Sequence, residues 1–199
     1  MSKAKITTPV TKAAFKYFRQ GGGENTICDL HSALNKLGWK LLNNNGSFSV
    51  IYWNPRKSYV LKINRVEDDS YQNYVKLIHT YSNKHFPRIG DMKVLRIGKI
   101  NYYVYLIEKL QTLPKAGAIS YIIDRAFNAL DSSEDFSEKG CMDALKQEFN
   151  GRLPKILKDK SLIDAIRLLT IDTTIFWDMH SENIMLRKDG TIVIIDPYM

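Results

Sequence analysis

The stretch that decides how this chain is interpreted is Trp177-Asp178-Met179-His180-Ser181-Glu182-Asn183-Ile184-Met185-Leu186, which is followed by Thr191-Ile192-Val193-Ile194-Ile195-Asp196-Pro197. It places an aspartate, an asparagine five positions later and a second aspartate at the end of an apolar run. Phosphoryl transfer from a nucleotide uses such a set. One carboxylate orients the attacking hydroxyl, while an amide oxygen and another carboxylate hold the metal on the phosphates. The spacing therefore predicts phosphoryl-transfer chemistry.

The two apolar runs of this stretch are expected to form a hairpin. Residues 184–186 and 191–195 are typical of short strands, and a glycine-containing turn separates them. A hairpin of this length would bring Asn183 and Asp196 together over one ion, and Mg²⁺ favours few carboxylates plus phosphate oxygens and water. Taken singly, Asp178 could cap a turn and Asp196 could merely end a strand. Their joint spacing favours Asp178 as a catalytic residue and Asn183 with Asp196 as metal ligands.

Upstream, Lys62 lies within the apolar segment Val60-Leu61-Lys62-Ile63. Apolar residues on both sides predict a strand with one inward-facing ammonium group, and in a kinase this lysine neutralises nucleotide phosphates. The alternative is an exposed strand lysine. Its position one hairpin after a glycine-containing turn favours the phosphate-binding role.

The preceding turn resembles a phosphate-covering loop that has lost some of its glycines. Compared with the pattern G-x-G-x-F-G-x-V, it keeps Gly46 and Phe48, while Asn44 and Ser49 stand where glycines would. Asparagine tolerates positive φ and serine is small, so the loop could still close over phosphates. The alternative is an ordinary hairpin turn.

The segment from Glu108 to Pro114 is expected to connect two lobes. From position alone, the carbonyl group of Glu108 and the amide group of Leu110 would pair with an adenine ring.

Hydrophobic periodicity predicts a mixed α+β chain. The spacing of apolar residues changes from helical to alternating near Trp39 and returns to helical after the connector. The predicted helices cover residues 9–20, 25–37, 69–82, 118–130, 141–149 and 162–176, and the predicted strands of an antiparallel sheet cover 39–43, 47–53, 58–63, 92–97 and 101–108.

Composition is that of an ordinary globular protein, with 199 residues, 44% hydrophobic residues and 25% charged residues. The net charge of +8 comes from scattered basic residues, and the densest cluster, residues 155–160, is diluted by apolar and acidic neighbours. This distribution favours a solvated basic surface over a nucleic-acid groove, so we expect no direct nucleic-acid binding. Basic charge would also help recruit a nucleotide or an acidic protein partner.

Cys28 and Cys141 lie far apart in the sequence and belong to no Cys-x-x-Cys pair, which predicts two reduced, buried thiols. No long apolar run follows the N-terminal charges, and no span approaches the ~18 apolar residues of a membrane helix. We therefore expect neither a signal peptide nor a membrane segment, and an intracellular, cytoplasmic protein.

The segment Asp-Met-His-Ser-Glu-Asn-Ile-Met (178–185), followed by Ile-Ile-Asp-Pro (194–197), resembles the catalytic segment of the early protein kinases of T7-like bacteriophages. Asn-x-Gly-x-Phe-Ser (44–49) and the lysine of Val-Leu-Lys-Ile resemble their N-terminal lobe, so the similarity spans about residues 39–199. More broadly, the chain is similar to the Asp-x-His-x-x-Asn class of atypical and aminoglycoside kinases, which share His180 where typical Ser/Thr kinases have lysine.

This resemblance implies a Ser/Thr protein kinase that uses ATP and Mg²⁺ to phosphorylate host proteins of the transcription and RNA-processing machinery, and possible targets include itself. It implies the cytoplasm of the infected bacterium as the location. Lys62 would bind phosphates, Asp178 would be the base, and Asn183 and Asp196 would ligate the metal. His180 would either support the γ-phosphate or brace the catalytic loop.

The implied fold is bilobal and protein-kinase-like. Residues 1–38 would form a helical extension, 39–110 a five-stranded antiparallel N-lobe, and 111–199 a truncated helical C-lobe. Phe176-Trp177 replaces the usual His-Arg before the catalytic aspartate, and only three residues follow Asp196. We therefore expect no activation segment and no large helical C-lobe.

Two alternatives belong to other functional classes. A pseudokinase would use the same scaffold to bind a host factor. The incomplete glycine loop favours this alternative, whereas the joint presence of Lys62, Asp178, Asn183 and Asp196 argues against it. A small-molecule kinase of the aminoglycoside type would need an acidic pocket built from residues after Asp196. The sequence does not indicate an oligomeric state.

Overall fold

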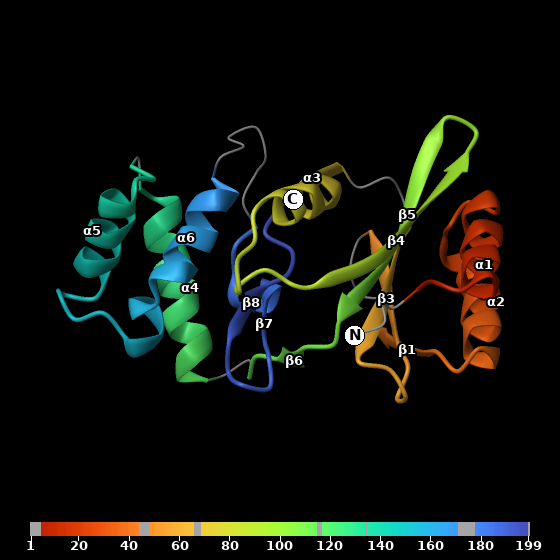
Figure 1. The fold of residues 1–199 in the computed structure, drawn as a ribbon, viewed down its shortest axis with the longest axis horizontal. Coiled ribbons are helices and arrows are strands. Elements are labelled where there is room, and N and C mark those ends of the chain that lie inside the picture. The colour runs from red at the N-terminus through yellow and green to blue at the C-terminus, as the bar shows by residue number, and fades with distance from the viewer. Residues whose placement is uncertain are drawn as a thin grey trace. The chain divides into compact units, whose positions relative to one another are not determined.

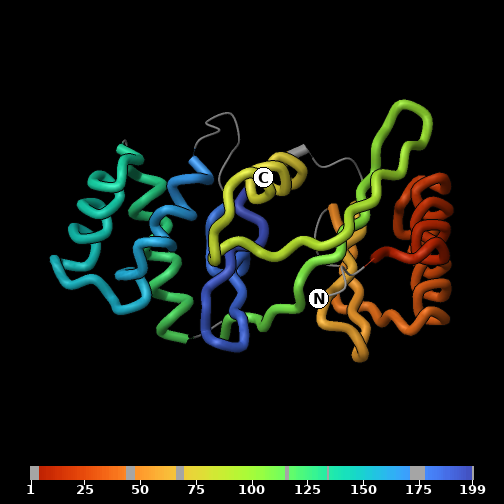
Figure 2. Tube along the Cα trace, viewed as in Figure 1, coloured from red at the N-terminus to blue at the C-terminus, as the bar shows by residue number. Residues whose placement is uncertain are grey.

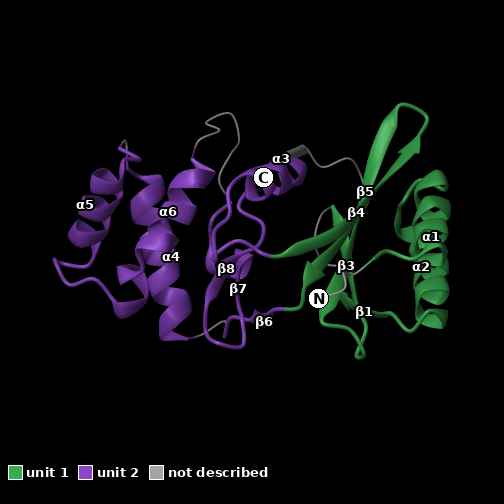
Figure 3. Cartoon of the chain, viewed as in Figure 1, with its two compact units in different colours: residues 1–69, 88–109 green, residues 70–87, 110–199 purple. Residues whose placement is uncertain are grey.

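The computed structural model describes residues 5–43, 48–65, 69–114, 117–133, 135–170 and 178–198 (Figure 1). The chain divides into two compact units, in which residues 1–69 group with 88–109 and residues 70–87 group with 110–199 (Figure 3). The third crossing between the units falls between Lys109 and Leu110, inside the predicted connector. The fold is mixed α+β, as the sequence predicts.

The first unit combines two helices with a five-stranded antiparallel sheet in the order β1-β2-β3-β5-β4. The edge strand β4 and its neighbour β5 form a long hairpin, traced in Figure 2, that turns at Gly98 (φ 65°). The elements of this unit are α1 (Thr8–Arg19), α2 (Glu24–Lys36), β1 (Lys40–Asn43), β2 (Ser49–Trp53), β3 (Tyr59–Asn64), β4 (Ile89–Ile97) and β5 (Ile100–Glu108).

The helices α1 and α2 cover one face of this sheet. Val10, Ala14 and Tyr17 recur at helical spacing on α1 and are buried, together with Leu30 and Leu34 of α2. They share one hydrophobic core with alternate residues of the strands, so α1 and α2 pack directly on the sheet. The strand residues of this core are Val50, Tyr52, Leu61, Ile63, Leu95, Val104 and Leu106.

The turn between α1 and α2 depends on a glycine. Gly22 has a φ of 60°, and a Cβ at this position would lie 2.8 Å from the carbonyl oxygen of Arg65. The Gly22 carbonyl also accepts a hydrogen bond from the buried Tyr17 hydroxyl. Any side chain here would therefore combine a strained backbone with a steric clash.

The second unit contains a small three-stranded sheet in the order β6-β7-β8 and most of the helices. The β7–β8 hairpin matches the predicted one, with Met185 opposite Val193. The elements of this unit are α3 (Asp69–Thr80, apart from its first residue), β6 (Gln111–Thr112), α4 (Ala118–Asp131), α5 (Glu138–Glu148), η1 (Lys155–Lys158), α6 (Lys160–Leu169), η2 (Ser181–Asn183), β7 (Ile184–Leu186) and β8 (Ile192–Ile194).

Several elements differ from their predicted bounds. α5 begins at Glu138 rather than at Cys141, because the Ser137 hydroxyl accepts a hydrogen bond from Gly140 N–H at 3.0 Å and starts the helix earlier. α6 ends at Leu169, and residues 171–176 of the predicted helix lie outside the described residues. Helix α3, expected within the N-lobe, groups with the second unit.

Both cysteines are free thiols, as predicted, but only Cys141 is buried. The predicted burial of Cys28 is wrong, because this residue lies on the outer face of α2, away from the core positions Leu30 and Leu34. Among the described helices, none is both long enough and apolar enough to cross a membrane.

Candidate phosphoryl-transfer site

The β7–β8 hairpin and two backbone hydrogen bonds assemble the candidate site within the second unit. The N–H of Asp178 donates to the carbonyl oxygen of Pro197 at 2.8 Å, and the N–H of Ile195 donates to the carbonyl oxygen of Asn183 at 2.9 Å. Asp196 lies between these two anchored residues. The structure therefore brings the predicted residues Asp178, Asn183 and Asp196 together in one small region.

Within this loop, the amide group of Asn183 points at Asp178. Its Nδ2 donates to the backbone oxygen of Asp178 at 2.7 Å and to the carboxylate Oδ2 at 3.1 Å. This orientation is set by hydrogen bonding, and it leaves the amide oxygen Oδ1 as the acceptor available to a cation. Asn183 thus fixes Asp178 and presents a potential metal ligand at the same time.

His180 braces the same loop. Its Nδ1 accepts the Glu182 N–H at 3.2 Å, and its Nε2 lies 3.2 Å from Nδ2 of Asn183. Nε2 lies 3.3 Å from Oδ1 of Asp178, so the ring also contacts the proposed base. These contacts fit the predicted bracing role, and the γ-phosphate role stays a prediction. The side chains of Asp178 and His180 are 37% and 44% exposed, so both remain accessible to a substrate.

The strand that leads to Asp196 is anchored by Tyr74 of α3. The Tyr74 hydroxyl donates to the carbonyl oxygen of Ile194 at 2.5 Å. Burial, then the neighbouring Tyr71 and then the charge of Asp196 raise the pKa of Tyr74 well above its ordinary value. The hydroxyl therefore stays protonated as a donor, and the Asp196 carboxylate lies within electrostatic reach of it.

His85 contacts the same strand. Its backbone oxygen accepts the Ile194 N–H at 2.9 Å, and its ring Nδ1 lies 2.8 Å from the Ile192 oxygen. Its Nε2 lies 3.3 Å from Oδ2 of Asp159, which also contacts Lys84 Nζ at 2.6 Å. Burial lowers the pKa of His85 despite its bond to Ile192 and its proximity to Asp159. A neutral histidine thus connects β8 to the start of α6.

The donor set fits Mg²⁺ bound together with a nucleotide. Asn183 and Asp196 offer amide and carboxylate oxygens, the hard ligands that Mg²⁺ prefers, while phosphates and water commonly supply the rest. No cluster of three or more His, Cys, Asp or Glu residues suited to a metal occurs in the described ranges. Two protein ligands would leave the other coordination positions of Mg²⁺ to phosphate oxygens and water.

Lys62 lies on the central strand β3 of the first unit, between Ile51 of β2 and Tyr105 of β5. Leu61 and Ile63 on either side face α1 and α2, so Lys62 faces the opposite side of the sheet. It is only 4% exposed, which excludes the alternative of an exposed strand lysine. Its phosphate-binding role stays a prediction.

The other predicted nucleotide contacts are less completely described. Asn44 and Gly46 lie outside the described residues. Phe48 is 55% exposed, and Ser49 pairs with Asn64 at the start of β2. The carboxylate of Glu108 accepts the Arg88 N–H at 2.8 Å. The roles given to Phe48, Ser49, Glu108 and Leu110 stay predictions.

Sequence reasoning missed three residues that hold the site together: Tyr74, His85 and Asp124. Asp124 of α4 accepts the backbone N–H of Ser181 at 2.6 Å and its hydroxyl at 2.9 Å. Each of the three is distant in sequence from the segment it holds, so no local motif marks it. Tyr74 and His85 are buried and Asp124 is half-buried, and this burial becomes visible only in three dimensions.

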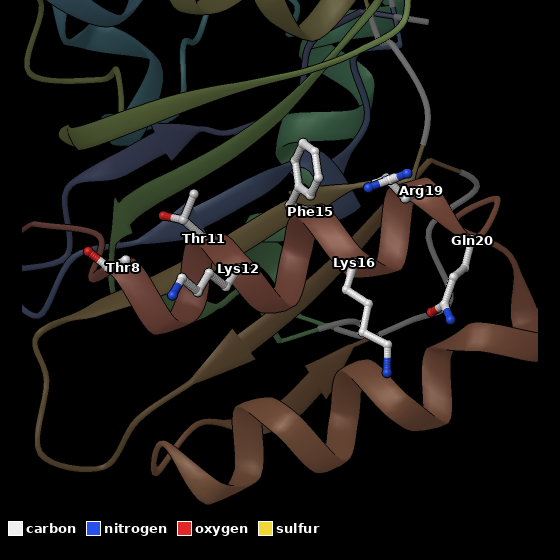
Figure 4. A pocket seen from close by; sticks show the side chains of 7 residues that line it. All are labelled: Thr8, Thr11, Lys12, Phe15, Lys16, Arg19 and Gln20. Carbon is white, nitrogen blue, oxygen red and sulfur yellow. The ribbon is translucent and has the colours of Figure 1, made fainter.

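A separate groove of about 570 Å³ lies along α1 and includes none of the predicted site residues (Figure 4). Phe15 and Lys16 point to different sides of this helix in Figure 4, and Lys16 pairs with Asp29 of α2 at 3.6 Å. The groove is lined by Thr8, Thr11, Lys12, Phe15, Lys16, Arg19 and Gln20.

No protein-family model matches this chain, and no curated protein matches it either. The functional interpretation therefore depends on the geometry of residues 178–198, the burial of Lys62 and the sequence resemblance.

Proposed function

We propose that this chain is an ATP- and Mg²⁺-dependent Ser/Thr protein kinase that phosphorylates host proteins. The observation that carries the proposal is the pair of backbone hydrogen bonds joining Asp178 to Pro197 and Asn183 to Ile195. These bonds hold three oxygen-bearing side chains in one region. Phosphoryl transfer depends mainly on such positioning and on electrostatic stabilisation.

In this mechanism Asp178 accepts or orients the proton of the attacking hydroxyl. Asn183 and His180 contact its carboxylate on different oxygens, at 3.1 and 3.3 Å, and so fix its direction. The amide oxygen of Asn183 and the carboxylate of Asp196 would hold Mg²⁺, which neutralises charge on the transferred phosphoryl group when bound. Lys62 would neutralise the remaining phosphate charge.

A two-lobed, kinase-like fold is part of the proposal. Its support is the five-stranded antiparallel sheet with a buried lysine on the strand β3, followed by α3 and then by a unit with most of the helices. The catalytic loop and the hairpin that ends at Asp196 follow the helices in the order that the resemblance implies.

The test is transfer of radiolabelled γ-phosphate from ATP with Mg²⁺ to a generic Ser/Thr acceptor protein and to bacterial lysate. Asp178→Asn should lower transfer by at least about 10²-fold, the typical contribution of general acid–base catalysis. Asp189→Asn is the matched control, because Asp189 lies in the exposed turn of the same hairpin and bonds only locally to Thr191 N–H. It should retain wild-type transfer.

The same samples should be melted with and without Mg·ATP. A rise in melting temperature that requires both Mg²⁺ and nucleotide is expected for the wild type and for Asp178→Asn, since ligand binding stabilises the folded state. Full transfer by Asp178→Asn would contradict the proposed mechanism. Nucleotide binding without transfer by the wild type would instead favour a binding protein built on the same scaffold.

A further inference from the structure

We propose that Asp124 of α4 is a positioning residue that fixes the catalytic loop through Ser181, an inference that rests on the proposed kinase function. Oδ1 of Asp124 accepts the Ser181 N–H at 2.6 Å, and Oδ2 accepts the Ser181 hydroxyl at 2.9 Å. Both carboxylate oxygens are engaged by one residue. Such charge-assisted hydrogen bonds are shorter and stronger than neutral ones.

The position of Ser181 makes this contact mechanistically important. Ser181 begins η2 and lies between His180, which contacts the proposed base, and Asn183, which would hold the metal. The two ends of the loop are held by backbone bonds at Asp178 and Asn183. Asp124 holds its middle, so it controls how the base and the metal ligand are oriented relative to each other.

The helix α4 is a rigid support for this contact. Ile123, Ala126 and Phe127 around Asp124 are buried in the core. The adjacent Arg125 donates to the Glu148 carboxylate at 2.5 Å and to the Glu148 backbone oxygen at 2.8 Å, which joins α4 to the end of α5. Asp124 therefore fixes the short catalytic loop relative to a packed helix.

The substitutions Asp124→Ala, Asp124→Asn and Ser181→Ala separate positioning from charge. Alanine removes both hydrogen bonds. Asparagine can still accept the Ser181 N–H with its amide oxygen and can donate to the hydroxyl oxygen with its amide nitrogen. Ser181→Ala keeps only the backbone bond. Asp143→Ala is the matched control, because Asp143 is an exposed helix carboxylate of the same unit that pairs with Lys139.

In the kinase assay, Asp124→Ala should lower kcat by roughly 10²-fold, because small misplacements of reacting groups have effects of this size. The KM for ATP should change less than kcat. Asp124→Asn should restore most of the rate, Ser181→Ala should lie between them, and Asp143→Ala should match the wild type. A merely structural role would instead lower activity only in proportion to the folded fraction, measured by circular dichroism on the same samples.

Hydrogen–deuterium exchange without nucleotide tests the anchor independently of activity. Peptides covering residues 178–186 should exchange faster in Asp124→Ala than in the wild type, whereas peptides from α5 should not change. Unchanged exchange in the loop, an unchanged kcat, or an asparagine variant as impaired as the alanine variant would each overturn the inference. Absence of transfer by the wild type is a different result. It overturns the proposed function and the catalytic role inferred for Asp124. The hydrogen–deuterium exchange experiment still decides whether Asp124 anchors the loop.

Discussion

The two units present their proposed catalytic groups in different ways. Lys62 is held by the strand register, with β2 on one side and β5 on the other, in the middle of a five-stranded sheet. Asp178 and Asn183 lie instead on a short loop whose position depends on Pro197 and Ile195 of the adjoining hairpin and on Asp124, which is distant in sequence. A sheet fixes a side chain through many equivalent backbone bonds, whereas a loop depends on a few individual contacts. Substitutions should therefore affect the two regions differently.

Among the substitutions that test this difference between the units, Lys62→Met is expected to have the largest kinetic effect. Removing the ammonium group should lower kcat/KM for ATP by about 10- to 100-fold, since hydrogen bonds to charged groups contribute about 1.5–3 kcal/mol. The fold should tolerate a side chain of similar length because β3 keeps its register. Lys93→Met on β4 is the control, because Lys93 is an exposed lysine of the same sheet that pairs with Asp91 at 3.6 Å. Equal kinetic effects of the two substitutions would contradict a specific role for Lys62.

The second effect concerns pH and the anchoring of β8 in the second unit. The pKa of His85 is lowered by burial, so the folded state favours the neutral ring. Its contribution to stability is complete above the ordinary histidine pKa of about 6.5 and is lost as the pH falls below that value toward the folded pKa. Burial raises the pKa of Asp159, but hydrogen bonds from Lys84 and Ser161 outweigh it, and the net pKa is lowered. The Asp159 contribution is therefore lost only below about pH 4.

Urea unfolding at pH 7, pH 5 and pH 3.5, followed by circular dichroism, checks whether the His85 contribution is lost at a higher pH than the Asp159 contribution. The wild type should lose stability between pH 7 and pH 5, and His85→Gln should reduce that loss because it removes the titrating ring. His31→Gln is informative as a comparison, since the pKa of His31 in the first unit is also lowered, by burial and then by Arg65. If His85→Gln leaves the pH 7 to pH 5 change intact, His85 does not act as the neutral anchor of β8.

The difference between the units also explains what the sequence predicted. The alternation of apolar residues around Lys62 is local, so the strand, its neighbours and the burial of the lysine could be predicted from it. The hairpin from Asn183 to Asp196 was predicted for the same reason, because its two short strands and turn are contiguous. The bounds of α5 and α6 were less accurate, since a capping residue such as Ser137 decides where a helix begins.

The contacts that hold the loop could not be predicted in this way. Asp124 precedes Ser181 by 57 positions and Tyr74 precedes Ile194 by 120 positions. A mid-helix aspartate or tyrosine has many ordinary surroundings, and only the packing of α3 and α4 selects the ones that contact this loop. Cys28 illustrates the opposite error, because an apolar preference predicted burial where the helix face points to solvent.

The smallest expected effect is a difference in reactivity between the two cysteines. Cys28 belongs to the first unit and Cys141 to the second. In native buffer, a thiol reagent such as Ellman's reagent should modify Cys28 rapidly and Cys141 only after local or global unfolding. Burial also raises the pKa of Cys141, so fewer of its thiols are in the reactive thiolate form.

Labelling Cys141 at increasing urea then reports the opening of the second unit alone. A Cys28→Ser protein isolates this signal, and the modification of Cys28 itself should leave phosphoryl transfer unchanged. Rapid labelling of both thiols in native buffer would show that α5, which packs against α4, opens easily, and this would weaken the case for α4 as a rigid support.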